Sequence, residues 1–571
     1  METAVEVCDL RLKFPGETRF VFKDLSFRAF RGEKVLLLGP SGSGKSTLLQ
    51  VLSGIIPRLV EVPMRCASQR LPRSWGYVFQ DPDTQFCMPF VDEELAFTLE
   101  NLGVPRPEMT ARMEAVLEDV GLRLPELHMP IQALSQGMKQ RLALASVLLG
   151  DPEVLLLDEP SALLDPEGRE QIWQSVSRIA EGRTLIIVEH RIEEILGLGL
   201  VDRVALFGPD GRLLGQGSPE TIFAEFRREL KEFGIWYPGV WTEFLAAPEG
   251  RRLLEPVPAL ARSGDGGGSS AGPPGAPLGT PSSAPFSAAA FSGPIPALAP
   301  LVELKGFRGL RMGRPVIEVE HAAVMPGDFI AVTGPNGAGK SSLLLSLMGL
   351  LKTEGEYFLR GVPMQGGKVG RRVRRRQMER AAQEIGFVFQ NPEFQFVADR
   401  VDEEAAFSLR EGGLSAAGIR GRTARILRQF GLEGYEGRHP YQLSLGQKRR
   451  LSVASAAVRE QPLLLLDEPT FGQDAANAFA ILLLCEELRR RGTAIVMVTH
   501  EEWIAATAAT QRWEVREGRL VSRSYTERGA AMAAITAEPG GTGLSESAGS
   551  CASSAPGRAA SGSAPKAVTL R

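Results

Sequence analysis

Short apolar runs recur along the chain, and each ends in residues able to carry chemistry. VLLLG ends at Gly39, VLLLD at Asp158 and TLIIVEH at His190. Uninterrupted runs of this length are typical of strands in a parallel sheet that is buried on both faces. Helical patterns such as STLLQVL follow the loops behind them. The pattern therefore predicts an α/β fold with a mostly parallel core sheet.

The whole series of strings occurs twice, in the same order. GPSGSGKST at Gly39 recurs as GPNGAGKSS at Gly334. The strings around Gln80, Ser135, Asp158 and His190 recur around Gln390, Ser444, Asp467 and His500. The later intervals match within one residue, whereas Lys45 to Gln80 is 35 residues and Lys340 to Gln390 is 50. The extra fifteen residues coincide with a basic run that begins at Lys368, so the chain is a tandem duplication with one local insertion.

Composition divides the chain into two globular halves and three other segments. The apolar content of the halves is sufficient for large cores, whereas Gly, Pro, Ser and Ala dominate the segment between them and the C-terminal tail. The basic run in the second half is expected to be a solvated surface insertion. The predicted organisation is a first domain over 1–235, a helical or irregular extension over 236–262, a flexible linker over 263–300, a second domain over 301–528 and a disordered tail over 529–571.

Charge and cysteine content narrow the classes of function. The net charge of −3 gives no reason to expect a nucleic-acid partner, and the five cysteines form no CxxC pair. The N-terminus is acidic where a signal peptide would be basic, and no run of eighteen apolar residues occurs. We therefore expect a cytoplasmic protein whose membrane role, if it has one, depends on a partner.

The two Gly-rich strings fit phosphate-binding loops of the form G-x-x-x-x-G-K-[ST]. Their glycines allow successive backbone N–H groups to face the phosphates of ATP, at the start of the following helix. The lysines are expected to contact the phosphates, and Ser46 and Ser341 to bind Mg²⁺. The predicted contacts are Gly39, Ser41, Gly42, Gly44, Lys45, Ser46 and Thr47 in the first loop, and Gly334, Asn336, Gly337, Gly339, Lys340, Ser341 and Ser342 in the second.

An Asp-Glu pair follows an apolar run in each half. The strand end is expected to hold Asp158 or Asp467 beside the magnesium ion, and the next residue, Glu159 or Glu468, to polarise the attacking water.

LSQGM at Leu134 and LSLGQ at Leu443 resemble the signature sequence of ATP-binding-cassette ATPases, because each lies 23 residues before its Asp-Glu pair. This resemblance implies two tandem nucleotide-binding domains, each with an antiparallel β subdomain and a helical signature subdomain. It makes His190 and His500 switch histidines, and it makes Gln80 and Gln390 magnesium ligands that respond to a membrane partner. Phe14 and Phe307 are candidates for stacking on the adenine base.

Pairs of cassettes in this family bind ATP between the phosphate loop of one half and the signature of the other. The resemblance therefore implies intramolecular pairing of the halves. One site would combine the first phosphate loop with Ser444 and Gly446, and the other would combine the second loop with Ser135 and Gly137.

QDPDTQF and QNPEFQF resemble the ATPase subunits of energy-coupling-factor transporters, which import cobalt and vitamins. This resemblance implies a peripheral position on the inner face of the cell membrane. It also implies two partners, a membrane scaffold of the T type and a substrate-binding membrane subunit. Gln85, Phe86, Gln395 and Phe396 are then expected to line the groove that accepts the scaffold.

Two other classes of tandem-cassette protein remain open. One acts on ribosomes without a membrane partner, although such proteins carry a charged helical linker that is absent here. The other is the fused ATPase of sugar importers, which lacks the QDPDTQF-type string.

Overall fold

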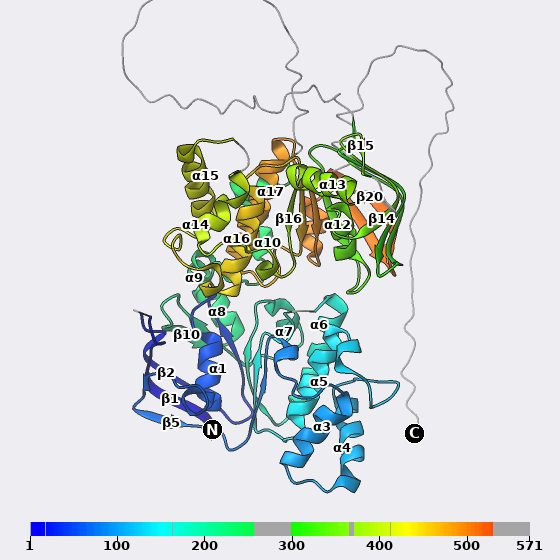
Figure 1. The fold of residues 1–571 in the computed structure, drawn as a ribbon. Helices are drawn as coiled ribbons and strands as arrows, with labels where there is room; N and C mark the ends of the chain where they lie inside the picture. Colours follow the sequence, from blue (N-terminus) through cyan, green and yellow to red (C-terminus); the bar gives the residue numbers. More distant parts are fainter. Residues whose placement is uncertain are drawn as a thin grey trace, which may run out of the picture.

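The computed structural model describes residues 2–17, 19–162, 164–255, 299–364, 370–410 and 413–528. Two α/β halves lie against each other, the first below the second in Figure 1. The predicted tail over 529–571 lies outside the described residues, as does the predicted linker except for its last two positions.

The first half contains a six-stranded core sheet and a separate small antiparallel sheet. The core has the order β10-β9-β3-β8-β7-β6 and is parallel except for β10, and the small sheet is formed by β1, β2, β4 and β5. The strands are β1 (Thr3–Leu12), β2 (Phe22–Phe30), β3 (Lys34–Leu38), β4 (Met64–Arg65), β5 (Ser68–Arg70), β6 (Trp75–Val78), β7 (Val154–Asp158), β8 (Thr184–Val188), β9 (Arg203–Phe207) and β10 (Leu213–Gly217). The helices are α1 (Lys45–Ser53), α2 (Ile55–Arg58), α3 (Val91–Asn101), α4 (Arg106–Asp119), α5 (Gln136–Leu148), α6 (Pro166–Ile179), α7 (Ile192–Gly197), α8 (Pro219–Glu225), α9 (Arg227–Glu232), α10 (Val240–Ala246) and α11 (Pro248–Arg251).

The second half repeats this arrangement in a single ten-stranded sheet of order β15-β14-β11-β12-β20-β19-β13-β18-β17-β16. The strands are β11 (Val302–Arg311), β12 (Arg314–Val324), β13 (Phe329–Thr333), β14 (Lys352–Leu359), β15 (Val362–Pro363), β16 (Ile385–Val388), β17 (Leu463–Asp467), β18 (Ala494–Val498), β19 (Gln511–Arg516) and β20 (Arg519–Tyr525). The helices are α12 (Lys340–Leu347), α13 (Arg371–Glu384), α14 (Val401–Ala406), α15 (Ala416–Gln429), α16 (Leu445–Ala457) and α17 (Ala475–Arg490).

The predicted fold class is confirmed in both halves. Every residue of β7, β8, β17 and β18 is buried, as expected for parallel strands covered on both faces. One feature was not predicted: the antiparallel and parallel strands of the second half join through a single partner pair, Glu318 with Arg519.

The two halves pack with their helical parts on opposite sides of the molecule (Figure 1). In Figure 1 the helices α3, α4 and α5 lie at the lower right, and their counterparts α14, α15 and α16 lie at the upper left. The helical part of each half therefore lies on the side where the other half has its antiparallel strands. Across the parts of the chain that the structure describes, no helix is both long and apolar enough to cross a membrane.

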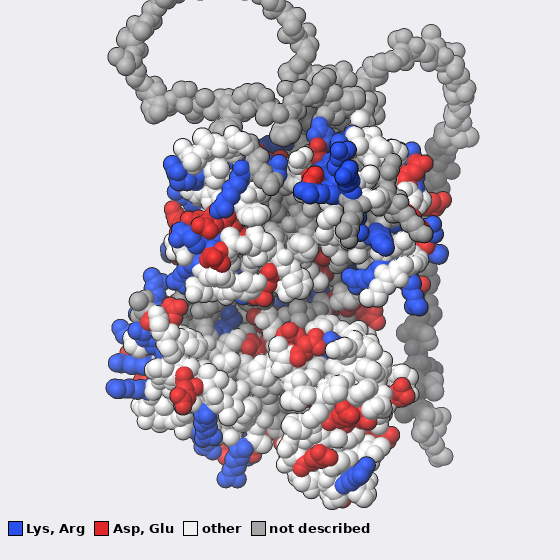
Figure 2. Space-filling view, in the orientation of Figure 1, with Lys and Arg blue, Asp and Glu red and all other residues white. Residues whose placement is uncertain are grey.

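The basic run of the second half forms α13, which leads directly into β16. Its arginines contribute the blue patch at the top of Figure 2, and Arg375 is 83% exposed in an ion pair with Glu379 of the same helix. The inserted residues thus form an exposed helix beside the core sheet. Lys368 lies outside the described residues.

The predicted extension, described over 236–255, packs on the second half. Just before it, the carbonyl of Gly234 accepts a hydrogen bond of 2.8 Å from the N–H of Ala475, and within it Trp236 Nε1 donates to the carbonyl of Gln473 at 2.8 Å. In the second half, Ala475 is the first residue of α17 and Gln473 lies two residues before it. The extension is therefore a structural link between the halves.

Aromatic side chains fill this contact. Phe479 of α17 stacks on Phe244 with centroids 3.9 Å apart and meets Trp241 edge-on at 4.9 Å. Trp241 also lies parallel to Trp503, at 6.2 Å. Aromatic pairs of this kind add to the stabilisation that burial already gives, so the halves share one apolar core at this interface.

Gly234→Ala tests this contact, because a Cβ at this position would lie 2.4 Å from the Cβ of Ala476 in the other half. Overpacking of this kind costs about 1–3 kcal/mol. Gly182→Ala is the matched control: φ is +67° at Gly234 and +74° at Gly182, but a Cβ at Gly182 meets nothing within 4 Å. We expect a lower thermal unfolding temperature for Gly234→Ala than for Gly182→Ala. Equal temperatures would contradict the packing described.

Candidate nucleotide sites

The strand order brings the features that the two repeats share to one edge of each sheet. In the first half β3, β8, β7 and β6 are neighbours and run parallel. Their carboxyl ends lead to the Gly-rich loop, His190, the Asp158–Glu159 pair and Gln80. The neighbours β13, β18, β17 and β16 place the second set in the same way. Each half therefore has one compact candidate site.

The Gly-rich loops depend on glycine at the last position before the helix. Gly44 (φ +93°) and Gly339 (φ +105°) precede α1 and α12 in the left-handed region, where side chains are strained. A Cβ at Gly339 would also lie 2.7 Å from the carbonyl oxygen of Val316. The tight turn lets the next residue, the lysine, begin the helix.

Both loop lysines fold back onto their own loops. Lys45 Nζ donates to the carbonyls of Gly39 and Pro40 at 2.7 and 3.0 Å, and Lys340 Nζ makes the equivalent bonds at 2.9 Å. Burial lowers the pKa of each lysine, although Glu159 and Glu468 oppose this effect. A buried ammonium with incomplete compensation is suited to a phosphate anion, so the loops fit the phosphates of a nucleotide.

A hydroxyl and a carboxylate lie together beside each loop. Ser46 Oγ donates to Asp158 Oδ1 at 2.8 Å, and Ser341 Oγ donates to Asp467 Oδ1 at 3.1 Å. Burial raises the pKa of both aspartates, to about 6 for Asp467. Hydroxyl and carboxylate oxygens are ligands that suit Mg²⁺ together with phosphate oxygens. A cation at this position would also favour the charged form of the buried carboxylate.

A glutamate and a histidine are paired in each half. His190 Nε2 lies 3.1 Å from Glu159 Oε1, and His500 Nε2 lies 3.1 Å from Glu468 Oε1. The glutamates adopt left-handed backbone conformations, with φ of 48° and 52°, which are unusual for a residue with a side chain and recur at functional sites.

Electrostatics keep these glutamates ionised. Burial opposes ionisation of Glu159, but the charge and hydrogen bond of His190 outweigh it and lower the pKa of the carboxyl. The same balance, with His500 as the partner, lowers the pKa of Glu468. Both carboxylates are therefore ionised at neutral pH, which is the form that a general base requires.

The two sites differ in their surroundings. Gln80 Nε2 donates to Glu159 Oε2 at 2.9 Å, whereas Gln390 is solvent-exposed. Tyr77 donates its hydroxyl to Asp158 Oδ2 at 2.9 Å, and the equivalent residue of the second half is Phe387. The first site therefore contains two hydrogen bonds, from Gln80 and Tyr77, that the equivalent residues Gln390 and Phe387 do not make in the described part of the second half.

The signature serines begin the helices α5 and α16. Ser135 Oγ accepts from the N–H of Met138, and Ser444 Oγ accepts from the N–H of Gln447, both at 3.3 Å. These are N-cap contacts within one half. Among the residues that the structure describes, no hydrogen bond joins either serine to the opposite Gly-rich loop.

Two aspartates that were not predicted as site residues link each half to the Gly-rich loop of the other half. Asp165 caps α6 and also accepts, at 2.9 Å, a hydrogen bond from the N–H of Asn336 in the second Gly-rich loop. Asp474 caps α17 and is among the charges that act on Lys45 of the first loop. Each lies seven residues after its Asp-Glu aspartate, so the matching interval was a usable signal.

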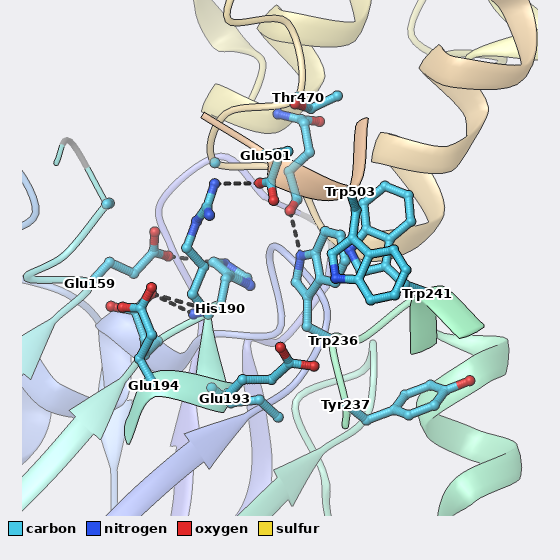
Figure 3. A pocket seen from close by; sticks show the side chains of 16 residues that line it. Glu159, His190, Glu193, Glu194, Trp236, Tyr237, Trp241, Thr470, Glu501 and Trp503 are labelled. Carbon is cyan, nitrogen blue, oxygen red and sulfur yellow. Dashed lines mark hydrogen bonds and ion pairs between the residues drawn. The ribbon is translucent and has the colours of Figure 1, made fainter. Parts of the chain in front are cut away.

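A cavity of about 120 Å³ lies between the halves beside the first site (Figure 3). Glu159 and His190 line one side, while Trp236, Trp241 and Trp503 line another. The first site thus borders directly on the aromatic contact between extension and second half.

One expectation about an individual residue was wrong. Phe307 is fully buried on β11, with its ring 5.8 Å from Tyr357, because the strand alternation points it into the core; it cannot stack on a base. The amides of Gln85 and Gln395 donate to the carbonyls of Ala143 and Ser452 at 3.1 and 2.8 Å, which ties each loop to a helix of its own half; that these residues line a partner groove stays a prediction. Phe14 is half-buried, two residues after the end of β1.

The comparisons with known proteins agree with this arrangement. The family model described as "ABC transporter" matches residues 22–162 and 321–471. A putative HMP/thiamine import ATP-binding protein of Bacillus subtilis is 34% identical over 88% of this chain and 87% of its own length. A putative ABC transporter ATP-binding protein of Streptococcus pneumoniae is 32% identical over 91% of this chain and 90% of its own.

A solved structure of an archaeal ribosome recycling factor, in complex with a ribosomal stalk protein, covers 92% of both chains with a TM-score of 0.56. Its identity is 19%, so this likeness concerns the fold alone. The two family matches fall on the two repeats, and each repeat carries its own Gly-rich loop, Asp-Glu pair and histidine. The chain therefore belongs to the ABC transporter ATP-binding proteins and contains two ATP-hydrolysing cassettes.

Proposed function

We propose that this ATPase is the energy-coupling subunit of an importer of the energy-coupling-factor type. It powers uptake of a vitamin, a vitamin precursor or a transition-metal ion through separate membrane subunits. The observation that supports the proposal is that two halves of one chain pack on each other and each carries a Gly-rich loop, an Asp-Glu pair and a histidine. The named activity of the Bacillus subtilis relative, import of HMP or thiamine, supports the importer class.

In this proposal the Gly-rich loops and lysines hold the phosphates of ATP, and Ser46 with Asp158, or Ser341 with Asp467, holds Mg²⁺. Gln80 and Gln390 complete the metal environment when nucleotide is bound. The magnesium ion would neutralise charge on the phosphate oxygens. The protein's own residues orient the nucleotide and exclude competing water.

The glutamates act on the attacking water. Glu159 is half-buried and Glu468 is buried, and their backbone N–H groups donate to the carbonyls of Val188 and Val498 at 2.8 and 3.1 Å. Each carboxylate takes a proton from the water, and His190 or His500 holds the carboxylate in position. A histidine hydrogen-bonded to this base can also orient the γ-phosphate.

The two sites are composite in this proposal. The hydrogen bond from Asn336 to Asp165 and the charge of Asp474 near Lys45 support a head-to-tail pairing. In that pairing Ser444 and Gly446 complete the first site, and Ser135 and Gly137 complete the second.

An exposed apolar surface beside the second site is proposed as the place where the membrane scaffold docks. Phe394 is 77% exposed and Val397 is 65% exposed, on the loop that follows Gln390. The half-buried ring of Phe396 lies 6.3 Å from Tyr441, which is itself half-exposed. Grouped exposed apolar side chains of this size commonly mark interaction sites.

Replacing both glutamates, Glu159→Gln and Glu468→Gln, should abolish turnover while nucleotide binding is retained. Glutamine keeps the shape but cannot accept the proton, so we expect ATP hydrolysis to fall by about 10²-fold or more. Phosphate release and binding of a fluorescent ATP analogue would measure the two properties. Glu167→Gln, an exposed position on α6, is the control and should hydrolyse ATP normally. Substantial activity in the double variant would remove these residues from the mechanism.

The composite arrangement predicts a contrast between two double variants. Lys45→Ala with Ser444→Arg damages one site, so its effect on ATP hydrolysis should be close to that of Lys45→Ala alone. Lys45→Ala with Ser135→Arg damages both sites and should reduce hydrolysis further, by about tenfold. Steady-state turnover of the double and single variants is the measurement. Equal losses in the two double variants would contradict the crossed arrangement.

Phe394→Glu should prevent association with the scaffold while leaving MgATP binding intact, since a charge would be buried in an apolar contact. Leu59→Glu is the matched control, because Leu59 is also 77% exposed but lies at the end of α2. The measurement is co-purification of the tagged chain with detergent-solubilised membrane proteins. Equal recovery of both variants would refute the proposed surface, and co-purification with ribosomes instead would refute the importer function.

A further inference from the structure

The residue that follows each paired histidine is charged, and the two charges are opposite. Arg191 follows His190 and Glu501 follows His500. Their side chains form an ion pair across the interface between the halves. Arg191 is 26% exposed and Glu501 is 17% exposed, so solvent and salt screen this pair less than a surface pair. Figure 3 shows the interaction at Glu501, on the wall of the cavity beside the first site.

We infer that Arg191 and Glu501 are positioning residues that couple the two catalytic histidines. The inference rests on the roles proposed above for His190 and His500. Through this ion pair, the position of the histidine in each site depends on a residue of the other half.

The backbone of the first half connects Arg191 tightly to His190. Glu189 Oε1 accepts hydrogen bonds from the N–H groups of both His190 and Arg191, at 2.8 and 3.2 Å. The other oxygen of Glu189 accepts from Ser161 Oγ at 2.7 Å, and the residue is 2% exposed. A displacement of Arg191 therefore acts on the same carboxylate that fixes the backbone of His190.

The second half holds Glu501 in a similar way. Its N–H donates to Thr499 Oγ1 at 3.0 Å, and its carbonyl accepts from the N–H groups of Ile504 and Ala505, both at 3.1 Å. His500 lies between Thr499 and Glu501. The ion pair thus joins two short, rigid segments, each of which contains a histidine that contacts its glutamate.

The opposite signs make the contact specific to unlike halves. Arg191 and Glu501 occupy equivalent positions in the two repeats, so a first half paired with a first half would bring two arginines together. Two second halves would bring two glutamates together. Like charges in a partly buried contact are unfavourable, and the pair therefore also favours the intramolecular arrangement.

Charge reversal tests the inference in the full-length chain. Arg191→Glu and Glu501→Arg each place like charges at the contact, and we expect kcat for ATP to fall by about tenfold in each with KM changed by less than about twofold. The double variant Arg191→Glu with Glu501→Arg restores the attraction and should recover kcat to within about threefold of the wild type. Glu255→Arg is the control, because Glu255 pairs with Arg490 across the halves at 3.1 Å, in a contact that involves neither histidine segment. It should leave kcat unchanged.

Several results would overturn the coupling. Single variants with wild-type kcat, or a double variant as slow as either single variant, would show that the pair does not position the histidines. A loss of kcat in Glu255→Arg equal to that in Arg191→Glu would mean that the pair only holds the halves together. His190→Ala with His500→Ala separates these failures from failure of the proposed roles: if that variant hydrolyses ATP normally, the histidine assignment itself is wrong.

Discussion

Both sites depend on four parallel strands whose order along the sheet is fixed. Because β3, β8, β7 and β6 are neighbours, the loop, the histidine, the acidic pair and the glutamine that follow them emerge at one edge. The register of the buried strands determines which side chains point toward the site, since a slip of one residue would turn each side chain to the other face of the sheet. The same order in the second half produces the second site. The buried apolar strands thus hold in place the polar residues that follow them.

Burial then sets the electrostatics of each site. It raises the pKa of Asp158 and Asp467 and lowers that of Lys45 and Lys340, so burial disfavours the charged forms of both residue types. The glutamates escape this effect because each has a histidine partner. A site of this kind favours a ligand that brings both anionic phosphate and a divalent cation, which agrees with the ATPase family to which the chain belongs.

The halves resemble each other but are not equivalent. The first contributes the extension that packs on Phe479, and its site has the hydrogen bonds of Gln80 and Tyr77. The second contributes the exposed helix α13 and the apolar residues around Phe394. Fusion in one chain allows such specialisation, because each half always meets the same partner.

The sequence by itself determined the fold class and the duplication, and it identified the candidate nucleotide-site residues. These features depend on short strings whose spacing is set within one strand–loop–helix unit, so local pattern is sufficient. Tertiary structure decided which residues connect the halves: Asp165 with Asn336, Arg191 with Glu501, and Trp236 with Gln473. It also showed that Phe307 is in the core and that Gln85 and Gln395 bind their own helices. Such contacts join residues far apart in the chain, and their energy depends on packing that no single segment contains.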